Sequence, residues 1–148
     1  MDTIMERFMA YAGDFERTLA DDEWSRLQPY FAPDAVYEVS GSFGCRLTGP
    51  AAIFAGMKKS LDGFDRKFAK RDIEVTSGPE VSADEIRMGW TVVYTAEGLP
   101  PFVLRGRSAV RYAGGKIVHL GDVFDPGVEG ELTAWQRATG VTLDPSYT

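Results

Sequence analysis

A carboxylate stands in an otherwise apolar strand in the segment His119–Asp125, whose sequence is HLGDVFD. The preceding GGKIV predicts a turn and the start of that strand. Because side chains of a strand alternate between its two faces, Asp122 shares a face with Leu120 and Phe124. A carboxylate in such surroundings is a candidate general base, since it can take a proton from an acidic C–H or from water.

Three other residues are candidates for the same site. Arg87, on a strand predicted over Glu85–Thr95, is expected to point into the pocket beside Asp122, where its guanidinium would keep the carboxylate ionised and oriented. Tyr37 is a candidate hydrogen-bond donor to a developing oxyanion, and Tyr11 on the first helix is a second candidate donor. Together these groups would form a cofactor-free site for proton transfer.

These assignments have structural alternatives. Arg87 and Asp122 can form a purely structural ion pair, or Asp122 can lie exposed at the end of its strand. If the faces of the middle strand are reversed, Arg87 lies on the surface, and Met88 and Trp90 face the pocket instead. His119 alternates with Asp122 and is therefore expected to point to the opposite face.

The composition excludes several classes of function. The chain has 148 residues, of which 44% are hydrophobic, enough for a single domain over 1–148 with a sizeable core. Its formal charge of −6 argues against nucleic acid or an anionic membrane as the partner. We find no signal peptide and no apolar run of membrane-spanning length. Cys45 is the only cysteine, which favours a reducing compartment, and we expect the protein in the cytoplasm.

The sequence predicts neither a metal nor another cofactor. No cluster of His, Cys, Asp and Glu has the spacing of metal ligands, and AGGK lacks the strand–loop–helix context of a phosphate-binding loop. Three arginines share one face of a later strand and indicate either a solvated face or a salt-bridged dimer surface: Arg105, Arg107 and Arg111.

The order of predicted elements indicates an α+β fold. Apolar residues three and four positions apart predict two N-terminal helices, followed by a strand over Ala35–Val39 and a helix that opens at Pro50. Turn residues then separate four predicted strands that precede a last helix over Glu129–Thr139: Phe68–Thr76, Glu85–Thr95, Phe102–Tyr112 and Lys116–Asp125. Short connections predict antiparallel pairing. The strand over Glu85–Thr95 is not fully polar on either face, so we expect a homodimer that covers the sheet.

Three strings carry a resemblance to a known family: YFAPDAVYEV, GPAAIFAG and GGKIVHLGDVFDP. Together they resemble the SnoaL-like group of the nuclear transport factor 2-like superfamily over nearly the whole chain. The resemblance implies a curved antiparallel sheet wrapped around N-terminal helices, with a deep apolar pocket inside the cone. Members include polyketide cyclases, ketosteroid isomerase, scytalone dehydratase and limonene epoxide hydrolase, so the fold does not determine the reaction.

The resemblance to limonene epoxide hydrolase assigns roles to single residues. GDVFD is similar to a segment whose first Asp activates water, which implies that role for Asp122. Tyr37 matches a Tyr that helps hold the water, and Arg87 matches the Arg of an Arg-x-Asp pair. Val39 and Gly89 stand where that family has an Asn and the second carboxylate.

We therefore expect a cofactor-free isomerase, cyclase, dehydratase or hydrolase that acts on a small hydrophobic molecule. Asp122 would be the base, Arg87 its orienting partner and Tyr37 a donor, with Trp135 on the last helix closing the pocket mouth. The residues expected to contact the substrate are Tyr11, Val39, Trp90, Leu120 and Phe124. The alternatives are a non-catalytic binding module, which the replacements at Val39 and Gly89 favour, and a dimerisation domain with a filled core.

Overall fold

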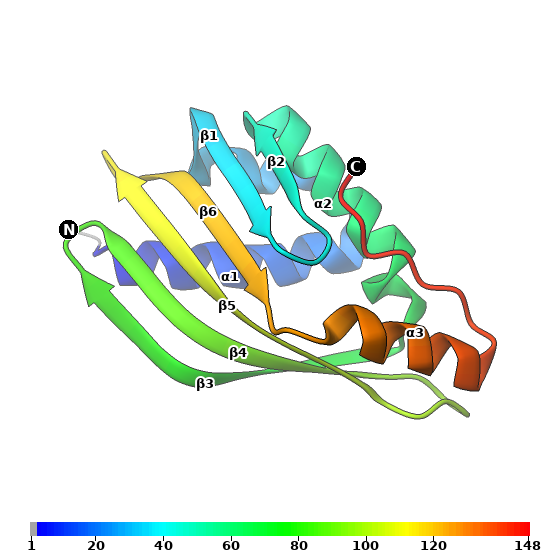
Figure 1. The fold of residues 1–148 in the computed structure, drawn as a ribbon. Helices are drawn as coiled ribbons and strands as arrows, with labels where there is room; N and C mark the ends of the chain where they lie inside the picture. The colour runs from blue at the N-terminus through cyan, green and yellow to red at the C-terminus, as the bar shows by residue number, and fades with distance from the viewer. Residues whose placement is uncertain (1–2) are drawn as a thin grey trace.

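The computed structural model describes residues 3–148, which form three α-helices, two short 3-10 helices and one six-stranded sheet (Figure 1). The helices are α1 (Ile4–Asp21), η1 (Trp24–Tyr30), α2 (Pro50–Gly63), η2 (Asp65–Lys67) and α3 (Val128–Thr139). The strands are β1 (Phe31–Ser40), β2 (Cys45–Thr48), β3 (Lys70–Ser82), β4 (Glu85–Thr95), β5 (Phe102–Ala113) and β6 (Lys116–Phe124). The predicted α+β fold is confirmed.

The sheet has the strand order β2-β1-β6-β5-β4-β3. The predicted antiparallel pairing of β3 to β6 is confirmed, but β1 and β6 run parallel, so the whole sheet is mixed rather than purely antiparallel. Two details differ from the sequence prediction. The four-residue strand β2 is too short to show a periodic pattern, and the predicted turn SGPE lies inside β3, where pairing with β4 shifts register.

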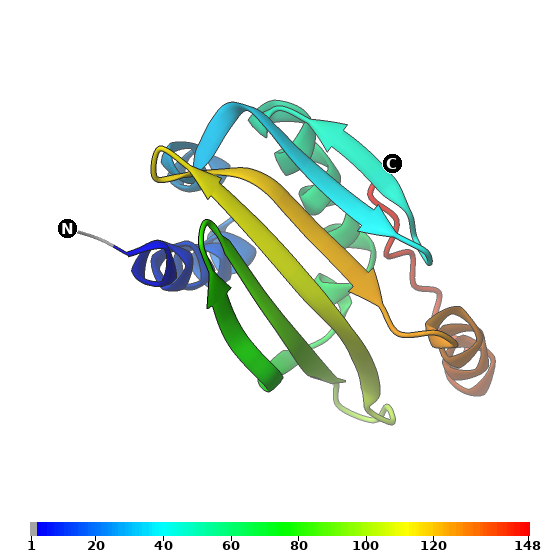
Figure 2. The same cartoon turned by 60° about the vertical axis from the view of Figure 1, so that its left-hand side comes forward.

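Helices α1 and α2 lie on one face of the curved sheet, as Figures 1 and 2 together show. The opposite face is turned toward the viewer in Figure 2, and no helix within residues 3–148 covers it. Helix α3 lies beyond the end of β6 (Figure 1). Side chains of these two helices and of the sheet line one cavity between them.

Helix α1 begins at a capped residue and turns an aromatic stripe toward the sheet. Thr3 caps it, since its Oγ1 accepts a hydrogen bond of 3.1 Å from the backbone N–H of Glu6. Tyr11, in the middle of the helix, is buried, and its ring contacts those of Phe15 and Phe31. This stripe places Tyr11 between α1 and the sheet, where this cavity lies.

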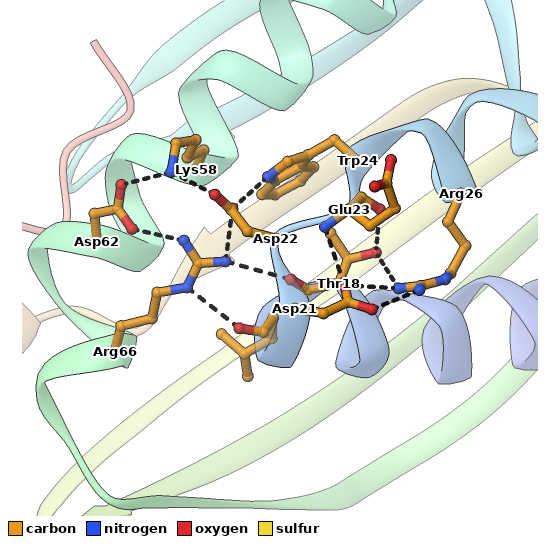
Figure 3. Close-up of polar contacts among 10 residues, drawn as sticks. Thr18, Asp21, Asp22, Glu23, Trp24, Arg26, Lys58, Asp62 and Arg66 are labelled. Atoms are coloured by element: carbon orange, nitrogen blue, oxygen red, sulfur yellow. Dashed lines mark hydrogen bonds and ion pairs between the residues drawn. The ribbon is translucent and has the colours of Figure 1, made fainter.

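An ion-pair network ties the end of α1 to α2 (Figure 3). The Asp22 carboxylate accepts hydrogen bonds from Trp24 Nε1 at 2.8 Å, Lys58 Nζ at 2.8 Å and Arg66 Nη2 at 2.9 Å. Arg66 Nη2 also donates to the backbone carbonyl of Thr18, which lies in the last turn of α1. A cation at a helix C-terminus satisfies free carbonyls, so this network holds α1 and α2 in place against the sheet.

Trp135 on α3 packs into the core at one end of the sheet. Its ring contacts Phe68 at 5.5 Å and Phe102 at 6.2 Å between centroids, and its Nε1 donates to the carbonyl of Pro100 at 3.0 Å. The expectation that Trp135 closes the pocket mouth is wrong, because these contacts anchor its ring in an aromatic cluster away from the cavity that contains Asp122.

Candidate active site

A cavity of about 390 Å³ lies between the concave face of the sheet and helices α1 and α2. Its lining is mostly apolar and aromatic, with side chains from both helices and from five of the strands. Pro145 and Tyr147, which follow α3, complete the lining. The cavity has the size and character of a site for a small apolar molecule.

Asp122 lies in this cavity, and both of its carboxylate oxygens are held by neutral donors. Tyr37 Oη donates to Oδ2 at 2.6 Å, and Ser108 Oγ donates to Oδ1 at 2.6 Å. Trp90 Nε1 donates to Ser108 Oγ at 2.8 Å. Because an indole N–H can only donate, Ser108 accepts from Trp90 and directs its own proton to Asp122.

The strand register explains why these residues meet. Asp122 on β6 is the partner of Ser108 on β5, and Ser108 is the partner of Met88 on β4. Met88 and Trp90 therefore share the inner face with Asp122. On the other side of β6, the parallel strand β1 places Tyr37 beside Leu120, two residues before Asp122.

Burial controls the ionisation of the site. Burial raises the pKa of Asp122, and the hydrogen bonds from Ser108 and Tyr37 oppose that rise. Burial first, and then the charge of Asp122, raise the pKa of Tyr37 well above its ordinary value. Among residues 3–148, no ion pair involves Asp122. Neutral donors, rather than a cation, therefore stabilise the carboxylate.

Arg87 does not lie beside Asp122, and the expected pair is not formed. Its side chain is 72% exposed and makes an ion pair with Glu85 on the same strand. In register, Arg87 faces Ala109 on β5, and Ala109 faces Gly121 on β6. These positions alternate with Asp122 and belong to the outer face, so the alternative with Met88 and Trp90 inward is the one the structure contains.

Four of the five residues expected to contact a substrate line the cavity. They are Tyr11, Trp90, Leu120 and Phe124. Val39 does not line it, although it is the register partner of Asp122 on β1. Its short side chain is 3% exposed and packs within the hydrophobic core, so the prediction for Val39 is wrong.

A second cluster of polar side chains lines the same cavity near Tyr94 of β4. Tyr94 Oη donates to Asp65 Oδ2 at 2.9 Å, and Arg71 Nε lies 3.1 Å from the same oxygen. Arg71 Nη1 also lies 2.7 Å from Glu16 Oε1 on α1. Burial raises the pKa of Asp65, and the nearby Arg71 opposes that rise. We interpret this cluster as a structural link between α1 and the sheet.

The sequence reasoning missed Ser108 and Tyr147. Ser108 could have been found, because it alternates with the exposed Arg105 and Arg107 and so belongs to the inner face of its strand. Tyr147 lies in an irregular segment, where no periodic signal exists. Its ring packs against that of Tyr37, with centroids 5.4 Å apart.

The outer face of the sheet carries several charged side chains. His119 points to this face, as predicted, and its Nε2 lies 3.4 Å from Glu38 Oε1. Arg105, Arg107 and Arg111 are all exposed, and both alternatives, a solvated face and a salt-bridged dimer surface, share this feature. Over the described part of the chain, no group of three or more His, Cys, Asp and Glu residues is placed to hold a metal ion. None of the helices within 3–148 combines the length and hydrophobicity needed to cross a membrane.

Comparison with known proteins places the chain in a family. Residues 12–120 match the SnoaL-like domain, so the chain belongs to the SnoaL-like family. No curated protein sequence matches it significantly. The family defines the fold and the position of the cavity, while the reaction depends on the residues within it.

Solved structures agree with this assignment. An NTF2-like protein of unknown function from Burkholderia pseudomallei K96243 is 16% identical and has a TM-score of 0.69, covering 91% of this chain and 98% of that one. TerC, co-crystallised with polyporic acid, is 17% identical with a TM-score of 0.65, over 88% and 98% of the two chains. A proposed polyketide cyclase from Xanthomonas campestris pv. campestris is 21% identical with a TM-score of 0.58, over 90% and 98%. At these identities the likeness concerns the fold alone.

Proposed function

We propose that the protein is a cofactor-free enzyme in which Asp122 acts as general base on a small apolar molecule. One observation carries the proposal: a half-buried carboxylate, held only by neutral hydrogen-bond donors, lines a cavity that is otherwise mostly apolar. Burial raises the pKa of Asp122 from its ordinary value, which brings its basicity closer to that needed near neutral pH.

The geometry leaves room on Asp122 for a substrate proton. A carboxylate offers about four lone-pair positions, and Tyr37 and Ser108 each occupy one of them. A C–H bond of a bound molecule can therefore approach a free lone pair while both oxygens stay oriented. Tyr11 lines the same cavity, and burial and the charge of Asp122 keep its hydroxyl protonated by raising its pKa. We assign Tyr11 as the donor to a developing oxyanion.

The site favours isomerisation or cyclisation over epoxide hydrolysis. Epoxide opening in the related hydrolase needs a second acid, and Gly89 stands at that position in this chain. Gly89 also lies on the outer face, since its register partner Arg107 is exposed. Proton abstraction next to a carbonyl needs one base and one oxyanion donor, which Asp122 and Tyr11 supply.

Solvent deuterium incorporation tests this proposal. We suggest incubating the protein in D₂O with apolar C–H acids, beginning with 2-tetralone, and following loss of the exchangeable proton by NMR. Asp122→Asn preserves the shape of the side chain and removes the base. We expect the variant to fold normally and to lose about 10²–10⁴-fold of the catalysed exchange. Equal exchange by both proteins would reject Asp122 as the base.

A binding module without chemistry is the second candidate. It is favoured by the capacity of the cavity to hold a small apolar ligand and by the pairing of its other two carboxylates, Glu16 and Asp65, with Arg71. In that case 2-tetralone or a similar compound binds, no exchange exceeds the buffer rate, and Asp122→Asn changes its affinity only modestly. Calorimetry performed beside the exchange assay separates the two candidates.

A homodimer through the outer face of the sheet is part of the proposal. This face carries no covering helix within the described residues (Figure 2). It includes the exposed Arg107 and the half-buried His119. Light scattering of the full chain tests the expectation, and a mass equal to one chain at micromolar concentration would contradict it.

A further inference from the structure

The segment 141–148, which follows α3, returns along α2 toward the Asp122 end of the cavity (Figure 1). The backbone N–H of Asp144 donates to the carbonyl of Gly63 at 3.0 Å. Ser60 Oγ donates to the carbonyl of Pro145 at 2.7 Å. Lys59 Nζ donates to Ser146 Oγ at 2.8 Å. The segment is thus bound to α2 by backbone and side-chain contacts along its path.

Small residues on α2 make this close approach possible. A Cβ atom added at Gly63 would lie 2.0 Å from the carbonyl oxygen of Asp144. A Cβ atom at Gly56 would lie 2.9 Å from the carbonyl oxygen of Tyr147. Gly56, Ser60 and Gly63 follow the spacing of four and three residues that places them on one helix face. The close packing of segment 141–148 against this face of α2 therefore requires small side chains at these three positions.

The docked segment delivers Tyr147 to the candidate active site. The rings of Tyr147 and Tyr37 meet edge to face, with an interplanar angle of 72° and centroids 5.4 Å apart. Both side chains line the cavity, as does Pro145. Burial and then the charge of Asp122 raise the pKa of Tyr147.

We infer that Tyr147 is a positioning residue whose ring holds Tyr37 in the orientation that donates to Asp122. Tyr37 is 2% exposed, so the side chains packed around its ring support the orientation of its 2.6 Å bond to Asp122. The edge of Tyr147 supplies that support from a segment outside the sheet. This inference rests on the proposed function in that both concern Asp122, but its test does not use turnover.

The hydroxyl proton of Tyr37 reports directly on this arrangement. A short hydrogen bond to a carboxylate predicts a downfield, slowly exchanging proton resonance, which Tyr37→Phe must remove to establish its assignment. We expect the resonance to persist in Tyr147→Phe, which keeps the ring, and to disappear in Tyr147→Ala. An unchanged resonance in Tyr147→Ala would overturn the inference.

A second pair of variants tests the close packing of segment 141–148 against α2 without changing any tyrosine. Gly63→Ala forces the segment away from α2, because the new methyl group would overlap the Asp144 carbonyl. Gly13→Ala is the matched control, since a methyl group at Gly13 on α1 meets no atom within 4 Å. We expect Gly63→Ala to lose the Tyr37 resonance and Gly13→Ala to keep it. Retention of the Tyr37 resonance in both variants would overturn the inference. This test also applies if Tyr147→Ala does not fold.

The outcome is separable from that of the proposed function. Wild-type protein that fails to exchange any C–H acid removes the catalytic role of Asp122, while the Tyr37 resonance and its dependence on Tyr147 can still be observed. Conversely, a Tyr37 resonance that is insensitive to Tyr147→Ala removes the positioning role, whatever the exchange rate.

Discussion

Tyr37 Oη donates a hydrogen bond of 2.6 Å to Asp122 Oδ2 across the only parallel pair of strands within residues 3–148. The two residues are 85 positions apart in the chain. The parallel register of β1 with β6 brings them together, and a hydrogen bond to the charged form stabilises the carboxylate that burial destabilises. This bond connects the fold to the chemistry that we propose.

Replacing Tyr37 by Phe should raise the pKa of Asp122. The Tyr37 hydrogen bond lowers that pKa, so its loss leaves burial less opposed. The acidic limb of an Asp122-dependent rate, on which the rate rises as the base loses its proton, should therefore move to higher pH. Titration of ¹³C-labelled aspartate carboxyls by NMR measures the change, and a pKa that falls or stays constant contradicts the role of this bond. We also expect a loss of about 1–3 kcal/mol in the free energy of unfolding.

Replacing Ser108 by Ala should act in the same direction on Asp122. Of the two hydrogen bonds that lower the pKa of Asp122, the one from Ser108 has the larger effect. The loss of Ser108 Oγ also leaves Trp90 Nε1 without its acceptor. We expect a higher pKa of Asp122 and a loss of about 1–2 kcal/mol of stability. The change near Trp90 should be visible in tryptophan fluorescence. Ser25→Ala, at an exposed position, is the control and should change neither property.

Replacing Arg87 by Ala should have almost no effect. The side chain is 72% exposed on the outer face, and exposed ion pairs such as that with Glu85 contribute little. We expect a change in stability within about 0.5 kcal/mol and an unchanged exchange rate. A drop of tenfold or more in exchange, with the fold intact, would show that Arg87 reaches the cavity and that β4 pairs with β5 in a different register.

The ion-pair network at the end of α1 predicts a loss of stability in acid. A hydrogen bond from Arg26 is the main cause that lowers the pKa of Asp21 to about 2. Hydrogen bonds from Lys58 and Trp24 lower the pKa of Asp22. A carboxylate with a lowered folded pKa stabilises the fold above its unfolded value of 3.8, and this contribution disappears as pH falls through the folded pKa.

Asp22→Asn isolates one member of this network. Asparagine tolerates the left-handed backbone that Asp22 adopts at φ 62°, so the substitution removes chiefly the charge. We expect the variant to melt at a lower temperature than the wild type at pH 7. The difference should shrink as pH falls below 3.8. Thermal melts across this range measure it, and a difference independent of pH would contradict the electrostatic role of Asp22.

Much of the fold follows from local patterns in the sequence. Alternating apolar residues predicted β4 with its observed bounds, and the inward orientation of Met88 and Trp90 was the alternative to an inward Arg87. The same alternation placed Asp122 among Leu120 and Phe124. Alternation alone leaves open which face of β4 points inward, so the expectation that Arg87 points inward was wrong. In the register that forms, Met88 rather than Arg87 occupies the row of Asp122.

The remaining features depend on contacts between distant segments. Nothing local in β1 indicates that it pairs in parallel with β6, yet that pairing creates the bond between Tyr37 and Asp122. Tyr147 lies in a segment without regular structure and reaches the cavity only because Gly56 and Gly63 let the backbone approach α2. Such placements arise from tertiary packing and have no periodic signal.

The pH dependence of deuterium incorporation into 2-tetralone, measured beside the ¹³C titration of Asp122, tests the central claim most directly. The account predicts that wild-type exchange rises through an apparent pKa equal to that of the Asp122 carboxyl, and that Asp122→Asn shows neither the rise nor exchange above the buffer rate. A rate profile that follows another pKa, or that persists in Asp122→Asn, would contradict the assignment of Asp122 as the base.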